Sequence, residues 1–267
     1  MLAYYSTAAH ADFWTEHWGG HTVEELLAIA AVSPLTDLIT AALPRQGVVL
    51  EAGCGLGQYV ILLRQRGWRT AGVDGSLAAL ATARLAMPVP LAASDLRALA
   101  IRSGSVAAYI SLGVVEHDPD GPDAILAEAR RVLAPGAILI VSVPYLNGAR
   151  HLGAPWIRRR ARAMAAAGGA FYQYAFSRRE LVAVLARHGF VTQAAHPYDP
   201  ARVLRGALPR AVVARGRRRS AAPPVRRPVA GSAASRGRLA ALVRRVLYTS
   251  PALRLLGHML LVVARRP

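Results

Sequence analysis

The chain has 267 residues, of which 54% are hydrophobic and 18% are charged. This length suits one large domain, and the composition is too apolar for global disorder. A single cysteine excludes an internal disulfide and a cysteine-based zinc site, and we expect no metal. The start of the chain lacks the charged leader and apolar core of a secretory signal, so we expect a cytoplasmic protein.

Charge is distributed unevenly along the chain. The net charge is +18, and every basic residue is arginine. Residues 1–144 contain 9 arginines against 13 acidic residues, whereas residues 145–267 contain 24 against 2. Such asymmetry predicts an anionic partner for the second half, either RNA or a membrane surface to which the protein would bind peripherally. A solvated surface that reflects coding bias explains the arginines equally well.

Residues 1–45 are expected to form a helical N-terminal cap that contains Tyr4, Tyr5, Phe13, Trp14 and Trp18. The core follows over residues 46–198. Strands are predicted at Val48–Leu50, Arg69–Val73, Val89–Ala93, Ala107–Leu112, Ala137–Val143 and Val191–Ala195. Helices are predicted at Gly57–Arg66, Ser76–Ala86 and Pro122–Leu133. Regular alternation of strands and helices predicts a mostly parallel sheet with helices on both faces.

Two insertions interrupt this pattern. The first, residues 145–176, is expected to form a lid that belongs to the core. After this insertion we expect another helix. Ser177 and Glu180 have the spacing of a capping box at its start, and Gly189 should end it. Residues 199–255 form an Arg-rich insertion, in which we expect Gly216–Arg238 to be mobile and Leu239–Leu256 to be a basic amphipathic helix. Residues 256–267 should provide the last strand, at Met259–Ala264.

The stretch VVLEAGCGLGQ, residues 48–58, contains the strongest functional signal. Gly53, Gly55 and Gly57 follow a buried strand, where they would let a ligand approach the backbone closely. A dinucleotide fold would show G-x-G-x-x-G, but position 58 is Gln. In an α/β sheet, ligands bind beyond the carboxyl ends of the strands, which is where this loop lies.

Four segments in this order carry a family resemblance: LEAGCGLG, GVDGS, ASDL, and YISLGVVEH followed by ARRVLAPGAILIVSVP. With them, the chain resembles the class I S-adenosylmethionine-dependent methyltransferases of the small-molecule type. The resemblance implies a doubly wound, Rossmann-like sheet of seven mostly parallel strands, and S-adenosyl-L-methionine as the cofactor. The Pro135-Gly136-Ala137 turn departs from the family, where a second glycine is usual.

The resemblance also implies roles for acidic residues at strand ends. Glu51 would lie near the ammonium end of the cofactor. Asp74 would accept hydrogen bonds from the ribose hydroxyls, and Asp95 from the adenine amino group, with the Leu96 N–H reaching a ring nitrogen. Together with Gly53, Gly55 and Gly57 they are the predicted cofactor-binding residues.

His117, after the fourth strand, is the candidate general base because its ordinary pKa lies near neutrality. A structural role for this turn explains it as well. We expect methyl transfer to an O, N or C atom of a small, lipid-like metabolite. Two alternatives stay open: an RNA methyltransferase that uses the Arg-rich half, and a cofactor-binding scaffold without catalysis.

Overall fold

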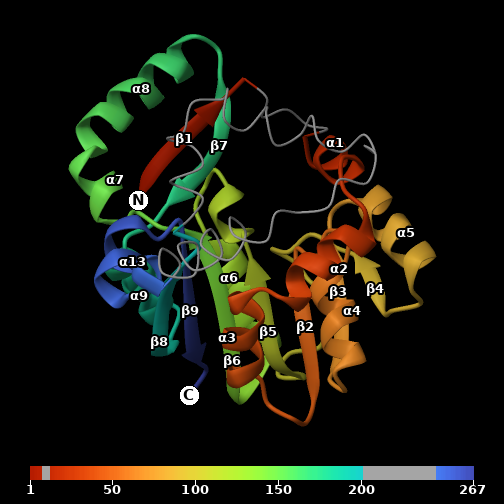
Figure 1. Ribbon diagram of the computed structural model, residues 1–267. Coiled ribbons are helices and arrows are strands. Elements are labelled where there is room, and N and C mark those ends of the chain that lie inside the picture. Colours follow the sequence, from red (N-terminus) through yellow and green to blue (C-terminus); the bar gives the residue numbers. More distant parts are fainter. Residues whose placement is uncertain (8–12, 201–244) are drawn as a thin grey trace, which may run out of the picture.

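A computed structural model describes residues 1–7, 13–200 and 245–267 (Figure 1). Its main sheet has seven strands in the order β4-β3-β2-β5-β6-β9-β8. The first five are parallel, and β9 runs antiparallel to both β6 and β8. The strand order reverses beside β2, so its carboxyl end opens onto the crevice where such sheets bind ligands. The predicted fold class is confirmed.

The strands of this sheet are β2 (Val48–Ala52), β3 (Arg69–Asp74), β4 (Leu91–Ala93), β5 (Val106–Leu112), β6 (Leu133–Pro144), β8 (Val191–Tyr198) and β9 (Met259–Arg265). The helices around it are α2 (Val23–Ala31), α3 (Pro34–Ala42), α4 (Gln58–Gln65), α5 (Leu77–Ala86), α6 (Asp123–Val132) and α9 (Arg178–Arg187). A short 3-10 helix, η1 (Val115–His117), follows β5. Most boundaries fall within two residues of those predicted.

Helices cover both faces of the sheet. On one face, α6 and α9 contribute Leu126, Ala129, Val132, Leu181 and Leu185 to a core that includes Leu50, Tyr109 and Val141. On the other, α2, α3 and α4 contribute Ala30, Ile39, Leu62 and Leu63, which pack against Val49, Ile110 and Ile140. Because β5 and β6 are buried on both faces, they read in the sequence as nearly continuous apolar runs.

Local capping follows the sequence closely. Ser177 accepts a hydrogen bond from the Glu180 N–H, and the Glu180 carboxylate accepts one from the Ser177 N–H, which completes the predicted capping box of α9. Ser76 caps α5 by accepting from the Ala79 N–H. These interactions span three residues, so the local sequence is enough to specify them.

The N-terminal cap differs from the prediction. Tyr4 and Tyr5 do not lie on a helix but on a strand, β1 (Leu2–Ser6). This strand pairs antiparallel with β7 (Ala170–Ala175) from the insertion at residues 145–176. Among the described residues of the cap, α1 (Phe13–Gly19), α2 and α3 are helical. The reason is non-local: β7 supplies the hydrogen-bonding edge that two tyrosines, which favour strands, can pair with.

The insertion itself consists of α7 (Gly148–Leu152), α8 (Ala154–Ala166) and β7. α8 packs against β1, and the two-stranded sheet lies beyond the carboxyl edge of the main sheet, on the same side as α1 (Figure 1). The division of the chain into cap, core and insertions stays a prediction.

The predicted helix at Leu239–Leu256 is interrupted in its described part, residues 245–256. Residues 245–247 are helical, Tyr248 and Thr249 are not, and α13 (Ser250–Leu256) begins anew. Pro251, which cannot donate to the preceding turn, stands in the first turn of α13 and accounts for the break. Residues 201–244, with the Gly216–Arg238 segment, lie outside the described residues.

Across the described ranges, no single helix is long and apolar enough to cross a membrane. The pair α2 and α3 would be long enough together, but they bend by 75° at their break.

Candidate cofactor and acceptor site

The glycine loop after β2 has a backbone that only glycine adopts readily. Gly53, Gly55 and Gly57 have φ values of 77°, 52° and 71°. Space is also restricted, because a Cβ at Gly53 would overlap Val114 and one at Gly55 would overlap the indole of Trp18 from α1. We call this loop, residues 53–57, the glycine cradle. Its backbone requires glycine at three positions, and packed side chains leave no room for a Cβ at two of them, Gly53 and Gly55.

Asp74 ends β3 beside this loop. Its carboxylate accepts a hydrogen bond from the Gly55 N–H at 2.7 Å and another from the Ser76 N–H at 2.8 Å. One oxygen thus fixes the loop and the other fixes the start of α5. A carboxylate has about four lone-pair sites, so two remain for ligand hydroxyls. The sequence did not predict the bond to Gly55.

Glu51 lies inside the protein, with 3% of its surface exposed. Its carboxylate accepts from the Val60 N–H at 3.1 Å, near the start of α4. Burial raises the pKa of Glu51 to about 8, with a smaller contribution from the Asp74 charge. The carboxyl is then mostly protonated at neutral pH, and a cation placed beside it would lower the pKa again. The predicted pairing with an ammonium group would therefore be coupled to proton release.

Asp95 lies two residues beyond the end of β4 and is exposed. Arg97 donates hydrogen bonds to the Asp95 carboxylate from its backbone N–H at 2.9 Å and from its guanidinium at 3.0 Å. These bonds lower the pKa of Asp95 and keep it charged. Leu96 is half-buried and packs against the core on the α6 side. An adenine amino group at Asp95 would share the carboxylate with Arg97.

His117 ends η1, after β5. Its Nδ1 lies 2.7 Å from the carbonyl oxygen of Tyr172 in β7. A carbonyl only accepts, so Nδ1 carries the hydrogen and Nε2 is left with a lone pair. Burial lowers the pKa of His117, which is therefore neutral at pH 7. The structure thus gives the ring the tautomer and charge state of a general base.

Glu116, next to His117, is a residue whose burial the sequence did not indicate. It is 1% exposed, and its Oε2 has no hydrogen-bond partner among the described residues. Burial raises its pKa to about 8. Its Oε1 lies 4.0 Å from His117 Nε2, which is beyond hydrogen-bond distance. At neutral pH, these two neighbouring side chains are therefore mostly uncharged.

Aromatic side chains cover His117 from two directions. The Trp14 ring from α1 meets the imidazole edge-on at 4.7 Å, and the Tyr172 ring lies 5.3 Å from it. Phe13 contacts Tyr172 at 5.5 Å. Trp156, in contrast, lies exposed on α8 and is not in this cluster. The cap and the insertion therefore meet over the strand ends. The sequence did not indicate this contact because the two segments lie far apart in the chain.

Cys54 is 1% exposed, and burial raises the pKa of its thiol, so it is not an available nucleophile. The parts of the chain that the structure describes contain no group of three or more His, Cys, Asp or Glu side chains that could hold a metal ion.

Comparisons with known proteins agree with this geometry. Residues 50–141 match a family model described as a methyltransferase domain. A segment of 97 residues is 35% identical to a probable S-adenosylmethionine-dependent methyltransferase of Mycolicibacterium smegmatis. That segment covers 36% of this chain and 37% of the relative. The chain thus matches little more than a third of the length of this curated relative.

Solved structures resemble the whole fold. An S-adenosylmethionine-dependent methyltransferase from Mesorhizobium loti has a TM-score of 0.55 at 18% identity, with 89% of this chain and 100% of that one covered. One from Archaeoglobus fulgidus has a TM-score of 0.57 at 13% identity, with 96% and 100% covered. Geranyl diphosphate C-methyltransferase from Streptomyces coelicolor has a TM-score of 0.56 at 13% identity, with 100% and 93% covered. Residues 50–141 thus match a methyltransferase domain, and the chain as a whole has the fold of S-adenosylmethionine-dependent methyltransferases.

Proposed function

We propose that the protein transfers a methyl group from S-adenosylmethionine to an O, N or C atom of a small, amphiphilic molecule. The observation that supports this proposal most directly is the pairing of two features at one sheet edge. The glycine cradle with Asp74 lies at the end of β2 and β3, and a neutral His117 lies at the end of β5.

The residues present fit the cofactor. Asp74 would hold the ribose hydroxyls, Asp95 and the Leu96 N–H the adenine, and Glu51 the ammonium group. The cofactor supplies a methyl group bound to a positively charged sulfur, which an electron pair of the acceptor displaces. Enzymes of this kind mainly position and orient the partners.

The protein's own contribution on the acceptor side is His117. An acceptor hydroxyl or protonated amine must lose a proton, and His117 Nε2 has the free lone pair to take it. The Tyr172 carbonyl holds the opposite nitrogen and would favour the imidazolium form once the proton arrives. A carbon nucleophile would likewise pass its proton to a base.

The size and polarity of the acceptor follow from what surrounds His117. Trp14 and Tyr172 cover the ring, so a bulky acceptor such as folded RNA would have to displace α1. Glu116 and His117 are mostly neutral at pH 7, which favours an uncharged or apolar group at the reacting atom. Both features favour a small amphiphile over the RNA alternative.

The test is tritiated-methyl transfer from S-adenosylmethionine into a cell extract separated into RNA, lipid and soluble small-molecule pools. Full-length protein is compared with the Asp74→Ala variant, which is expected to bind the cofactor poorly. The proposal requires Asp74-dependent label in the lipid or small-molecule pool. Label confined to RNA would establish the alternative substrate. Binding of S-adenosylhomocysteine with no label in any pool would favour the non-catalytic scaffold.

A further inference from the structure

The insertion at residues 145–176 carries an unusual surface away from the site. It contains five arginines and no acidic residue. Arg150 points inward, where its guanidinium donates to the Tyr145 carbonyl at 2.8 Å. The remaining four all lie exposed on α8: Arg158, Arg159, Arg160 and Arg162. In the described part of the chain, no acidic group lies within ion-pair distance of these four.

Large apolar side chains lie on the same surface. Leu152 at the end of α7 is 81% exposed, and Trp156 in the first turn of α8 is 64% exposed. They are four residues apart across Gly153, which has helical backbone angles, so they lie on one side of the helical segment. The Arg160 guanidinium carbon lies 5.6 Å from the centre of the Trp156 ring. Exposed Trp and Leu side chains between arginines are typical of interfacial helices.

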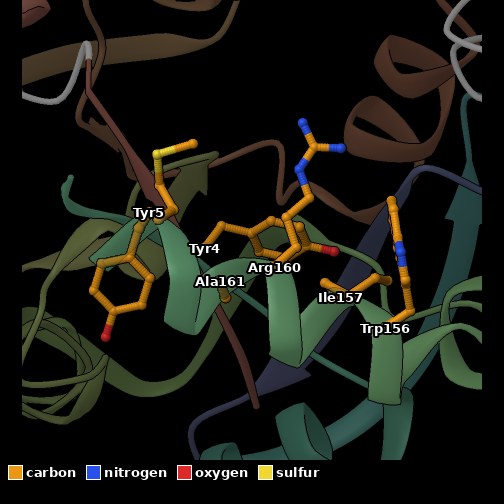
Figure 2. Close-up of a pocket in the computed structure, with 7 residues that line it drawn as sticks. Tyr4, Tyr5, Trp156, Ile157, Arg160 and Ala161 are labelled. Atoms are coloured by element: carbon orange, nitrogen blue, oxygen red, sulfur yellow. The ribbon is translucent and has the colours of Figure 1, made fainter. Parts of the chain in front are cut away.

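Residues of α8 line two hollows. Pro155, Arg158, Arg159 and Arg162 surround an open depression of about 460 Å³. A second, of about 310 Å³, lies between α8 and β1, with Tyr4, Trp156, Ile157 and Arg160 among its walls. Figure 2 shows Tyr4 beside Arg160 in this groove, with Trp156 at one end. The first hollow offers guanidinium groups to anionic headgroups, and the second offers aromatic walls to an acyl chain.

Neighbouring α13 extends this surface. Leu255 packs against Gly148 of α7 yet keeps 47% of its surface exposed, and Arg254 beside it is also exposed. Basic and apolar groups thus alternate over α7, α8 and α13, which lie together in Figure 1. Exposed apolar residues occur elsewhere too, such as Leu85 on α5 at 90%, but Leu85 has no comparable arginine cluster on its helix.

We propose that the surface formed by α7, α8 and α13 binds the headgroup region of an anionic lipid bilayer, with Leu152 and Trp156 inserted and the α8 arginines on lipid phosphates. Charge complementarity selects this occupant, because an arginine near an anionic leaflet contributes favourably to binding and the insertion has no acid to oppose it. Binding here does not depend on the methyl-transfer reaction.

The test is flotation of full-length protein with phosphatidylcholine vesicles and with vesicles that also contain phosphatidylglycerol. Residues 201–244 carry further arginines, so the comparison of variants, not wild-type binding alone, decides the matter. Arg158→Gln, Arg159→Gln and Arg162→Gln together should lower the partition coefficient on anionic vesicles on the order of 100-fold. Trp156→Ala should lower it roughly tenfold.

The matched control replaces three exposed arginines on other elements, Arg64, Arg69 and Arg102, by Gln. Leu85→Ser is the control for Trp156→Ala. Circular dichroism and S-adenosylhomocysteine affinity verify that each variant is folded. The proposal requires that the protein bind anionic vesicles, that salt weaken this binding, and that only the α8 variants lose it. No binding to anionic vesicles, or equal losses in the control triple, would overturn it. Arginine-dependent retention of transfer RNA with no difference on vesicles would overturn it too.

Discussion

The buried carboxyl of Glu116 makes a quantitative prediction about stability. The pKa of Glu116 rises from 4.5 to about 8 on burial. A carboxyl with a raised pKa in the folded state stabilises folding at low pH, and this contribution disappears as the pH rises from 4.5 through 8. At about 1.4 kcal/mol per pH unit, the loss amounts to at most about 5 kcal/mol. Glu116→Gln removes the ionisable group with almost no change in shape.

The assay is urea unfolding of wild type and Glu116→Gln between pH 5.5 and 8. The free energy of unfolding of wild type should fall relative to the variant by up to roughly 3 kcal/mol over this range. Glu51, whose pKa is also about 8, is present in both proteins and cancels from the difference. Between pH 5.5 and pH 8, the variant should therefore lose less of its free energy of unfolding than wild type does.

Glu128→Gln is the control of opposite sign. Glu128 is also buried, but Arg131 and the Leu99 N–H bind its carboxylate at 2.6 Å each, and Arg131 lowers its pKa. Its variant should be less stable than wild type by an amount that does not vary between pH 6 and 8. A difference between wild type and Glu116→Gln that is also flat with pH would refute the reasoning, because Glu116 would then be solvated or paired.

Three further predictions concern the site. Asp74→Ala should weaken S-adenosylhomocysteine binding by roughly 1–3 kcal/mol because hydrogen bonds to charged groups are lost, and unchanged affinity by calorimetry would exclude this residue from the cofactor site. Gly55→Ala should unfold at lower urea than Gly57→Ala: both strain a left-handed backbone at a cost of about 1–2 kcal/mol, but only the Gly55 variant overlaps Trp18, while a Cβ at Gly57 comes no closer than 3.6 Å to Ala83. Equal urea midpoints would argue against that contact. His117→Gln should slow methyl transfer about 10²–10⁴-fold and leave S-adenosylhomocysteine affinity unchanged, and a parallel loss of affinity would assign the residue to cofactor binding.

The sequence was informative where the relevant physics is local or follows from strand direction. The capping box of α9 involves residues three apart, and glycines with left-handed backbones stand out directly. Glu51 and Asp74 could be placed at one edge because parallel strands end on the same side of a sheet. Asp95 follows the same rule, although β4 ends two residues before it.

The remainder of the site depends on contacts between distant segments. Gly55 meets Trp18, and the imidazole of His117 meets a backbone carbonyl 55 residues away. A backbone carbonyl is present at every residue, so no residue type could mark Tyr172 as its partner. The strand β1 illustrates the same limit: its tyrosines tolerate helix or strand, and only β7, far along the chain, decides between them.

The pairing of β1 with β7 gives the cap and the insertion a common framework. β7 holds His117 through Tyr172 on one side, and β1 supports α8 on the other. A bilayer bound at α8 would therefore lie one two-stranded sheet away from the proposed base. An amphiphilic acceptor fits this arrangement better than a soluble one, because its apolar part can remain near the lipid while its reacting atom reaches the strand ends. Under these two proposals, the arginines of the insertion and the neutral side chains of Glu116 and His117 would serve the same substrate class, through separate residues that can be tested independently.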